Sequence, residues 1–260
     1  MAPWDARQYL RFEAERTRPC AELVGRIALE GPRTIVDLGC GPGTSTDVLR
    51  ARWPAAAITG IDSSEEMLRT ARARHPADPW VQGDLASWEP PAPLDLVFSN
   101  AALQWVPGHR ELLPRLWHGV APSGALAFQL PAPGPERAPW TEAVAEAFGR
   151  TAPAGRELPA DPTSHVLSGT EYYDLLTSLG AERVDLWDTV YLHAMPGPEG
   201  VVAWTQGMAL RPVLERLGSD ERRAGFLEAY RRGVAERYPP RGDGTVLLPF
   251  RRRFGIGYRR

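Results

Sequence analysis

Residues 35–43 place three glycines at alternate positions directly after an apolar run, in the order Ile-Val-Asp-Leu-Gly-Cys-Gly-Pro-Gly. Because glycine has no Cβ and adopts positive φ without strain, such a turn after a strand lets a ligand approach bare backbone amides. The spacing narrows the class of ligand. A dinucleotide fingerprint needs glycine where the chain has Thr44, and a phosphate-binding P-loop needs a lysine, which the sequence lacks.

An acidic residue ends the next apolar segment. Residues 57–62 finish with Asp62, which is 23 residues beyond Gly39. A carboxylate at about this distance accepts both ribose hydroxyls and repels a 2′-phosphate, so the pair of features favours adenosyl over NADP. Taken alone, the glycine turn also fits an ordinary strand–helix connection, and Asp62 alone fits a helix cap. Their occurrence together at strand–helix–strand spacing indicates a nucleoside site.

Polar residues follow the later strand ends in the same way. Ser63 or Ser64 is expected to cap a helix, and Met67 in its first turns is placed to lean over an adenine. Asp84 follows the third apolar segment and Asn100 ends the fourth. The carboxyl ends of parallel strands share one edge of a sheet, so these side chains are expected to face one ligand.

The pattern Asp-x-Gly-x-Gly-x-Gly over residues 37–43 resembles the first motif of class I S-adenosylmethionine-dependent methyltransferases. The resemblance implies that Asp37 lies close to the methionine part of S-adenosylmethionine and that Asp84 takes the adenine amino group. The residues expected to bind this cofactor are Arg16, Asp37, Gly39, Cys40, Gly41, Gly43, Asp62, Ser63, Met67, Gly83, Asp84, Leu85, Asn100, Ala101 and Trp105.

Composition excludes several other classes of protein. A formal charge of −2 and a pI near 6.2 give no general attraction to nucleic acid or to anionic membranes. No apolar run approaches the roughly 18 residues of a membrane span, and the first residues lack signal-peptide character, so a cytoplasmic protein is expected. Cys20 and Cys40 are expected to be free thiols, and the five histidines lack metal-site spacing. We expect a monomer or a homodimer.

Apolar segments typical of strands alternate along the chain with segments of helical periodicity, and this alternation predicts an α/β fold. A parallel sheet with right-handed crossovers follows from strands that alternate with helices. The expected strands are 34–38, 57–62, 79–83, 94–100 and 124–130, and the expected helices are 44–52, 64–74 and 109–120.

Beyond residue 130 the pattern changes to Pro/Gly-rich loops and further helices. Expected helices lie at 139–149, 169–179, 198–217 and 219–237, and expected strand segments at 183–191, 245–250 and 253–258. The resemblance implies a single class I methyltransferase domain over residues 1–260, Rossmann-like, with a mostly parallel seven-stranded sheet, an antiparallel last strand and a helical cap. Its expected parts are an N-terminal helical segment (1–30), a cofactor-binding core (31–130), cap insertions (131–182 and 194–244) and the last sheet strands (183–193 and 245–258).

A narrower resemblance covers nearly the whole chain. The segments that carry it are Trp4-Asp5 with Tyr9-Leu10 and Phe12, Arg16-Thr17-Arg18-Pro19, residues 100–107, Trp187 with Thr189, Tyr191 and His193, Trp204-Thr205 with Gly207 and Leu210-Arg211-Pro212, Tyr238-Pro239-Pro240 with Asp243-Gly244, Leu247-Leu248-Pro249-Phe250 and Arg253-Phe254. They resemble the trans-aconitate 2-methyltransferase family. The glycine-rich end, residues 255–258, departs from the plain apolar strand usual in that family, which puts the packing of the last strand in question.

The resemblance implies methyl transfer from a sulfonium to a carboxylate oxygen, which gives a monomethyl ester. A carboxylate is ionised at pH 7 because its reference pKa is near 4, so no acid or base catalyst and no metal is expected. Alignment of the reactants is the main task. Gln104, Trp105 and His193 are the residues expected to position them.

A tricarboxylate needs cationic partners, and the arginine fork suits carboxylates. The residues expected to contact substrate are Tyr9, Arg16, Arg18, Gln104, Trp105, Tyr191, His193, Arg211 and Arg253. All 30 basic residues are arginine, so most of them must be solvated surface charges. The aromatic residues at these spacings fit a hydrophobic core equally well.

Three functions compete at this point. The first is methylation of trans-aconitate or a related polycarboxylate. The second is methylation of another small molecule in a biosynthetic pathway, or a cyclisation in which the aminobutyryl arm of S-adenosylmethionine is itself the reactant. The third is a cofactor-binding module that pairs with another protein. Cap arginines favour the first function.

Overall fold

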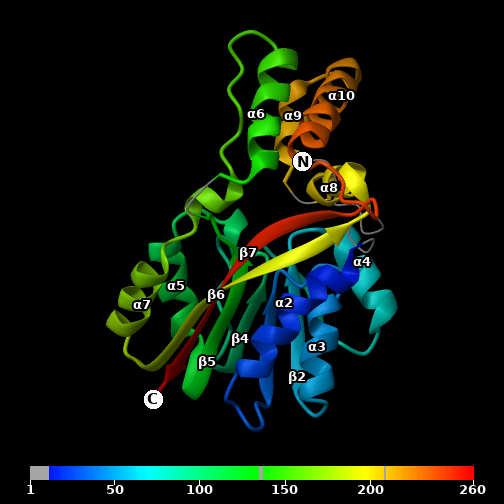
Figure 1. The fold of residues 1–260 in the computed structure, drawn as a ribbon. Helices are drawn as coiled ribbons and strands as arrows, with labels where there is room; N and C mark the ends of the chain where they lie inside the picture. Colours follow the sequence, from blue (N-terminus) through cyan, green and yellow to red (C-terminus); the bar gives the residue numbers. More distant parts are fainter. Residues whose placement is uncertain (1–11, 135–136, 208) are drawn as a thin grey trace. The chain divides into compact units, whose positions relative to one another are not determined.

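The computed structural model describes residues 12–134, 137–207 and 209–260. The described chain forms two compact units (Figure 1). The sheet unit comprises residues 12–132, 165–189 and 252–260, and the helical unit comprises the described parts of 133–164 and 190–251. Tyr9 and the Trp4-Asp5 motif lie outside the described residues.

The sheet has seven strands in the order β3-β2-β1-β4-β5-β7-β6. The pairs from β3 through β5 are parallel, and β7 runs antiparallel to β5. This topology confirms the predicted class I fold. The strands are β1 (Thr34–Leu38), β2 (Ala57–Asp62), β3 (Trp80–Gln82), β4 (Leu94–Asn100), β5 (Val120–Pro131), β6 (Ala181–Met195) and β7 (Val246–Arg259).

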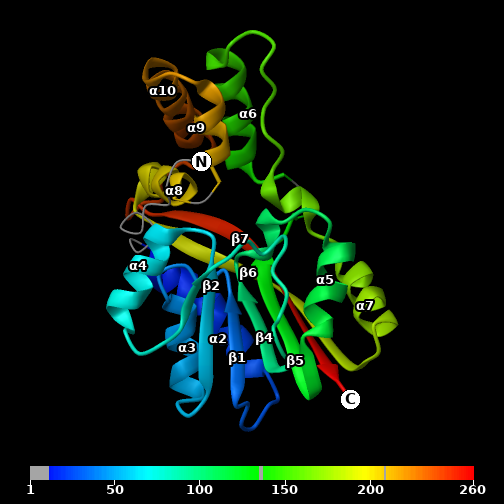
Figure 2. The same cartoon turned by 180° about the vertical axis from the view of Figure 1, so that it is seen from behind.

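Helices cover both faces of the sheet unit (Figure 2). They are α2 (Glu13–Arg26), α3 (Thr44–Arg52), α4 (Glu65–Arg74), α5 (His109–His118) and α7 (Gly169–Ser178), with a 3-10 turn η1 (Leu103–Trp105) before α5. Alternation along β1 defines the faces. Val36 and Leu38 pack in one core cluster with Leu112 of α5, whereas the Asp37 side chain between them bonds to α3. No described helix has the length and apolar character needed to cross a bilayer.

Helix α7 corrects the predicted cap boundary. The cap insertion 131–182 was expected to include this helix, but Tyr172 and Leu176 are fully buried in the core cluster of the sheet unit, where Tyr172 packs against Phe128. An apolar pair four residues apart on one helix face needs an apolar surface to cover it, and β5 supplies that surface. The local pattern predicts the helix but not the unit to which it belongs.

The helical unit contains α6 (Pro139–Thr151), η2 (Pro162–His165), α8 (Gly197–Gln206), α9 (Arg211–Leu217) and α10 (Asp220–Arg237). Helix α10 packs against α6 and α8, and the buried Thr205 hydroxyl bonds to the Tyr230 hydroxyl at 2.9 Å. The single helix expected over 198–217 is wrong. Gly207 caps the end of α8, and α9 begins with proline in its first turn, an arrangement typical of two separate helices.

Strand β7 is continuous where two segments, 245–250 and 253–258, were expected. Its glycines are required by close packing. A Cβ on Gly255 would lie 2.4 Å from the Phe128 ring, and one on Gly257 would lie 3.0 Å from the Trp117 ring. The glycine-rich end therefore lets β7 pass close to two buried aromatic rings, which explains the departure from the family pattern.

Candidate functional site

The glycine turn after β1 has the geometry expected of a ligand cradle. Gly39 and Gly41 have φ values of 73° and 54°. The two glycines serve different purposes. A Cβ on Gly39 would lie 2.1 Å from the Cβ of Ala102, so this position is closed by the segment after β4. A Cβ on Gly41 would meet nothing within 4 Å, so here the backbone is open to a ligand.

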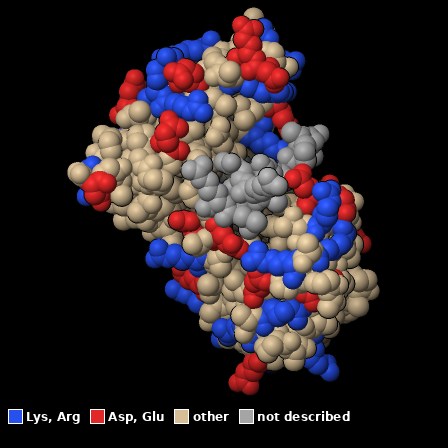
Figure 3. Space-filling model, turned by 90° about the vertical axis from the view of Figure 1, so that its right-hand side faces the viewer, with Lys and Arg blue, Asp and Glu red and all other residues tan. Residues whose placement is uncertain are grey.

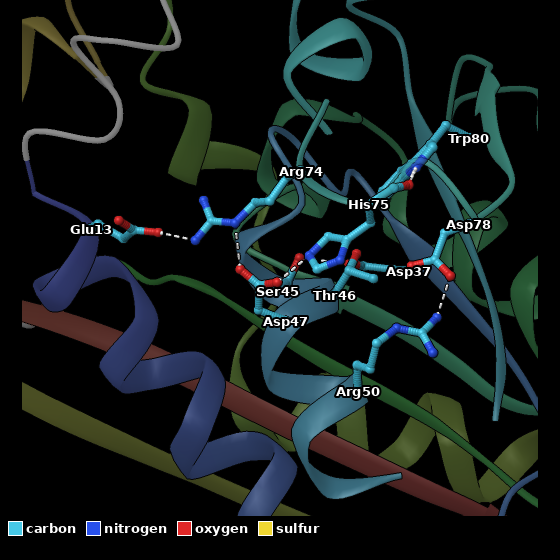
Figure 4. A network of polar contacts seen from close by, with 10 residues as sticks. All are labelled: Glu13, Asp37, Ser45, Thr46, Asp47, Arg50, Arg74, His75, Asp78 and Trp80. Atoms are coloured by element: carbon cyan, nitrogen blue, oxygen red, sulfur yellow. Dashed lines mark hydrogen bonds and ion pairs between the residues drawn. The ribbon is translucent and has the colours of Figure 1, made fainter. Parts of the chain in front are cut away.

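Asp37 is fully buried at the base of the turn. Its Oδ2 accepts hydrogen bonds of 2.7 Å from both Ser45 Oγ and Thr46 Oγ1 in the first turn of α3 (Figure 4). Its Oδ1 has no hydrogen-bond partner among the described residues. Burial raises the pKa of Asp37 to about 6. The two hydroxyls were not predicted, although adjacent Ser and Thr directly after a glycine turn are a usable signal.

Asp62 holds the turn in place from the end of β2. Its Oδ2 accepts from the Gly41 amide at 2.9 Å and its Oδ1 from the Ser64 amide at 2.8 Å. Burial raises the pKa of Asp62, while these backbone bonds oppose the rise. Each carboxylate oxygen can accept further hydrogen bonds, so the side chain can hold the turn and still receive ribose hydroxyls.

The segments after β2 and β3 carry the other predicted cofactor residues. Ser64 is the cap of α4, since its Oγ accepts from the Met67 amide at 3.4 Å, whereas Ser63 is exposed. Met67 is buried. Asp84 is exposed, and its Oδ1 accepts from the Ala86 amide at 2.9 Å. The other expected residues here are Cys40 and Leu85, which are buried, Gly43, which has positive φ, and Gly83, whose amide donates to the Asp62 carbonyl.

A second polar network braces the helices behind the turn (Figure 4). Asp47 of α3 pairs with Arg74 Nε at 2.8 Å and with His75 Nε2, both at the end of α4. Arg74 also pairs with Glu13 of α2 at 2.9 Å. These partly exposed pairs join α2, α3 and α4. Figure 3 shows arginine and acidic side chains interspersed on the face that it draws.

The chain is strained where it leaves β4. Asn100 ends the strand with 9% of its surface exposed, and the next residue, Ala101, has φ of 55°. The Ala101 amide donates to the Gln129 carbonyl at 2.7 Å, and the Gln104 Nε2 donates to the Ala101 carbonyl at 2.7 Å. Positive φ at a non-glycine residue costs about 1 kcal/mol or more and is commonest at functional sites. Trp105 follows in η1 and is half-buried.

Helix α2 presents one of its two predicted arginines to the interior. Arg16 is buried at 9% exposure, whereas Arg18 is exposed. Cys20 lies one turn beyond Arg16 on the buried face. Burial raises the pKa of Cys20, and the charge of Asp37 raises it further, so this face of α2 lies close to the glycine turn.

The predicted site residues Tyr191 and His193 belong to the helical unit. Tyr191 and His193 are buried on β6, and the His193 ring lies 4.8 Å from the Trp204 ring and 6.2 Å from the Phe250 ring between centroids. His193 therefore sits in an aromatic cluster of this unit.

The two remaining predicted arginines differ in how they are bound. Arg253 donates from Nε and Nη2 to the Asp188 carboxylate, both at 2.9 Å, and from Nη1 to the Leu167 carbonyl at 2.6 Å. All three nitrogens of the Arg253 guanidinium therefore donate to groups of the sheet unit. Arg211 begins α9 in the helical unit, where its Nε donates to the Glu215 Oε1 at 3.2 Å.

His109 and Gln129 are further buried polar side chains that the sequence did not predict. His109 Nε2 lies 2.9 Å from the Leu103 carbonyl, and Nδ1 lies 2.5 Å from the Tyr172 hydroxyl. Because a carbonyl only accepts, Nε2 carries the proton and Nδ1 accepts from the tyrosine, which ties η1 to α7. Burial lowers the pKa of His109, in keeping with a neutral ring. Gln129 of β5 is fully buried as well.

The part of the chain that the structure describes holds no group of three or more His, Cys, Asp or Glu side chains suited to a metal ion. A metal-independent reaction stays a prediction, with activity expected to survive EDTA. Loss of turnover with chelator, restored by a divalent ion, would contradict it.

Comparison with known proteins adds the family. A family pattern described as a methyltransferase domain matches residues 35–124. A trans-aconitate 2-methyltransferase of Methylobacterium nodulans is 47% identical over 260 residues, which cover 100% of this chain and 99% of the relative. A trans-aconitate 2-methyltransferase of Azoarcus sp. is 44% identical, and the match covers 100% of this chain and 100% of the relative.

Solved structures agree on the fold. YcgJ from Bacillus subtilis aligns with a TM-score of 0.58 at 12% identity, over 94% of this chain and 99% of its own. Phosphoethanolamine N-methyltransferase 2 of Haemonchus contortus, solved with S-adenosyl-L-methionine, aligns with a TM-score of 0.55 at 14% identity, over 94% of this chain and 53% of its own. The family is decided by the high sequence identity to the curated relatives over the full length of the chain. The chain belongs to the trans-aconitate 2-methyltransferase family.

Proposed function

We propose that the chain is an S-adenosylmethionine-dependent methyltransferase that forms a monomethyl ester on a carboxylate of trans-aconitate. The observation that carries this proposal is identity of 47% along the full chain to a trans-aconitate 2-methyltransferase, which includes the helical unit as well as the sheet unit. Substrate specificity depends on parts of the chain beyond the cofactor motifs, so a full-length match is more informative than a match to 35–124 alone.

The residues present fit the cofactor. Gly41 exposes backbone with no atom in the place of a Cβ, Asp62 offers accepting oxygens beside it, and Asp37 keeps an Oδ1 that no described residue bonds. An ionised Asp37 suits the ammonium group of the methionine part, and Asp62 suits the ribose hydroxyls. Bound S-adenosylmethionine supplies the methyl group as a sulfonium.

The chain's own residues have a positioning task. The acceptor carboxylate is already ionised at pH 7, so no side chain has to remove a proton. Fixing the acceptor oxygen in line with the methyl group is worth roughly 7–11 kcal/mol of barrier. Gln104 and Trp105 follow β4 on a segment held by Ala101 and His109, which is a rigid place from which to do this.

Product analysis tests the function. The protein is incubated with methyl-labelled S-adenosylmethionine and either trans-aconitate or a panel of other di- and tricarboxylates. Label in a trans-aconitate monomethyl ester, with one equivalent of S-adenosylhomocysteine, is expected. Methylthioadenosine released without an acceptor would indicate cyclisation of the cofactor instead. No turnover with any acceptor, despite tight cofactor binding, would indicate a binding module.

Arg211 is proposed as a cation that reads an acceptor carboxylate. Arg211→Ala should lower kcat/KM for trans-aconitate by about 10–100-fold, the loss expected for one charge-assisted hydrogen bond. Arg211→Lys should recover only part, because an ammonium lacks the planar fork. Arg216→Ala on the same helix is the matched control and should leave kcat/KM unchanged. Equal losses for trans-aconitate and a dicarboxylate would show that Arg211 does not read the distinguishing carboxylate.

A further inference from the structure

Gln129 carries the least satisfied polar side chain of the described sheet unit. It lies near the end of β5 with no exposed surface, yet neither its Oε1 nor its Nε2 has a hydrogen-bond partner among the described residues. Its backbone carbonyl accepts from the Ala101 amide. Buried amides are nearly always hydrogen-bonded, so a side chain of this kind has a specific explanation.

The sheet register places this amide beside a predicted site residue. Gln129 on β5 is the direct partner of Asn100 on β4, so both side chains leave the sheet on the same face. The register also places them on the face of Asp37, because Asp37 pairs with Phe98, which is two residues before Asn100. Opposite lies the core cluster with Phe128, which excludes Gln129 from that apolar face.

Helix α2 brings a cationic side chain to β5. Helix α2, whose buried face bears Arg16, packs against β5. The Asn100 and Gln129 amides are neutral and Arg16 is cationic, so these three side chains add no negative charge that would repel an anion.

We propose that Gln129 is a specificity residue whose amide N–H donates to a carboxylate of the acceptor, beside Asn100 at the ends of β4 and β5. The proposal rests on the function proposed above. An amide is suited to this task because it donates to a carboxylate without introducing a positive charge that would repel the cofactor sulfonium. A buried amide without a partner among the described residues is available to such a ligand, and it discriminates between acceptors because one that lacks the carboxylate leaves it unpaired.

Binding measurements with Gln129→Leu test the proposal. The variant keeps the volume but has no hydrogen-bonding group. Calorimetry on the S-adenosylhomocysteine complex should show trans-aconitate bound at least tenfold more weakly, and kinetics should show a KM raised by a similar factor. Affinity for S-adenosylhomocysteine should stay within twofold. If that affinity falls as much as the acceptor's, the amide serves the cofactor carboxylate and the proposal is overturned.

Thermal stability separates a ligand-binding role from a structural one. Because the amide bonds to nothing in the described chain, Gln129→Leu should raise the Tm of the unliganded protein by about 2–4 °C. Ser99→Ala is the matched control. Ser99 is fully buried on β4, and its hydroxyl donates to the Leu38 carbonyl at 2.9 Å, so its loss should lower the Tm by a similar amount and leave the acceptor KM unchanged. A lowered Tm in Gln129→Leu would assign the amide to the fold.

The outcome for the wild-type protein keeps the two proposals apart. If the wild-type protein methylates another carboxylate but not trans-aconitate, the proposed substrate fails while Gln129 is tested on the true acceptor. If the wild-type protein methylates trans-aconitate and Gln129→Leu binds it with unchanged affinity, the inference about Gln129 fails and the proposed function stands.

Discussion

The ends of β1 and β2 and those of β4 and β5 lie along one edge of the same sheet, yet they carry different polar groups. At β1 and β2 the groups are carboxylates, Asp37 and Asp62, which accept hydrogen bonds from their own chain. At β4 and β5 they are amides, Asn100 and Gln129, which keep unpaired atoms in the described chain.

This difference matches the charges of the two reactants. A cationic methyl donor with ribose hydroxyls is suited to carboxylates, whereas an anionic acceptor would be repelled by them. Neutral amides at β4 and β5 let the chain bind the acceptor carboxylate next to the sulfonium of the methyl donor. They place no further charge between these two reactants. The comparison therefore divides the sheet edge into a donor half and an acceptor half.

The strongest way to break the comparison is to make the acceptor half resemble the donor half. Asn100→Asp places a carboxylate beside the proposed acceptor site. Like-charge repulsion of several kcal/mol predicts about a thousandfold loss in kcat/KM for trans-aconitate. Cofactor affinity should hold or rise, because the new carboxylate faces a sulfonium. Isothermal titration with S-adenosylmethionine and steady-state kinetics check the two halves separately, and a parallel loss of cofactor binding would refute the division.

Asp37 allows the donor half to be tested by pH. Because burial raises its pKa from 3.8 to about 6, the folded state keeps a proton that the unfolded state has released. Its contribution therefore lowers the free energy of unfolding as pH rises from about 4 to about 6, by about 3 kcal/mol in all. Asp37→Asn removes this pH-dependent component. The free energy of unfolding of the variant, relative to that of the wild type, should therefore rise by about 3 kcal/mol between pH 4 and pH 7.

The pH dependence of cofactor affinity that Asp37 causes should be opposite to its effect on stability. The ionised form of Asp37 is the one that suits an ammonium group, so wild-type affinity for S-adenosylmethionine should rise as pH increases through about 6. Urea melts and calorimetry across this range, with Asp37→Asn beside the wild type, measure both trends. A cofactor affinity that is flat through pH 6 in the wild type would remove Asp37 from the binding site.

The two halves meet at Gly39, where a substitution tests their contact. Gly39→Ala adds a Cβ at 2.1 Å from that of Ala102 at a φ of 73°, and should cost about 2 kcal/mol in unfolding free energy. Gly41→Ala is the matched control, since its Cβ meets open space and only the φ strain remains. It should weaken cofactor binding with a smaller loss of Tm. Equal stability in both variants would show that the two loops do not support each other.

The sequence predicted the donor half better than the acceptor half, for a physical reason. Strand 57–62, helix 44–52 and the glycine turn are set by local periodicity and turn chemistry, and the structure has them at those residues. The bond between Arg253 and Asp188 joins residues 65 apart, so no local pattern reveals that this fork is occupied. Gln129 is likewise inconspicuous in sequence, because an unpaired amide is a property of its surroundings.

The smallest expected effect belongs to Asp62, which serves the chain and the cofactor at once. Asp62→Ala removes the acceptor for the ribose hydroxyls and also for the Gly41 and Ser64 amides. Charged acceptors contribute about 1.5–3 kcal/mol, but relief of the buried charge offsets part of this, so affinity for S-adenosylmethionine should fall about tenfold. Asp62→Asn, which keeps one carbonyl oxygen, should lose less.

The acceptor half should be untouched by both changes. At saturating cofactor, the KM for trans-aconitate in Asp62→Ala should remain within twofold of the wild type, because Asp62 lies on β2, which β1 and β4 separate from Gln129 on β5. Calorimetry with unchanged cofactor affinity would exclude Asp62 from the site. A raised acceptor KM at saturating cofactor would mean that the glycine turn also shapes the acceptor half, and the division of the sheet edge would then hold for charge but not for binding.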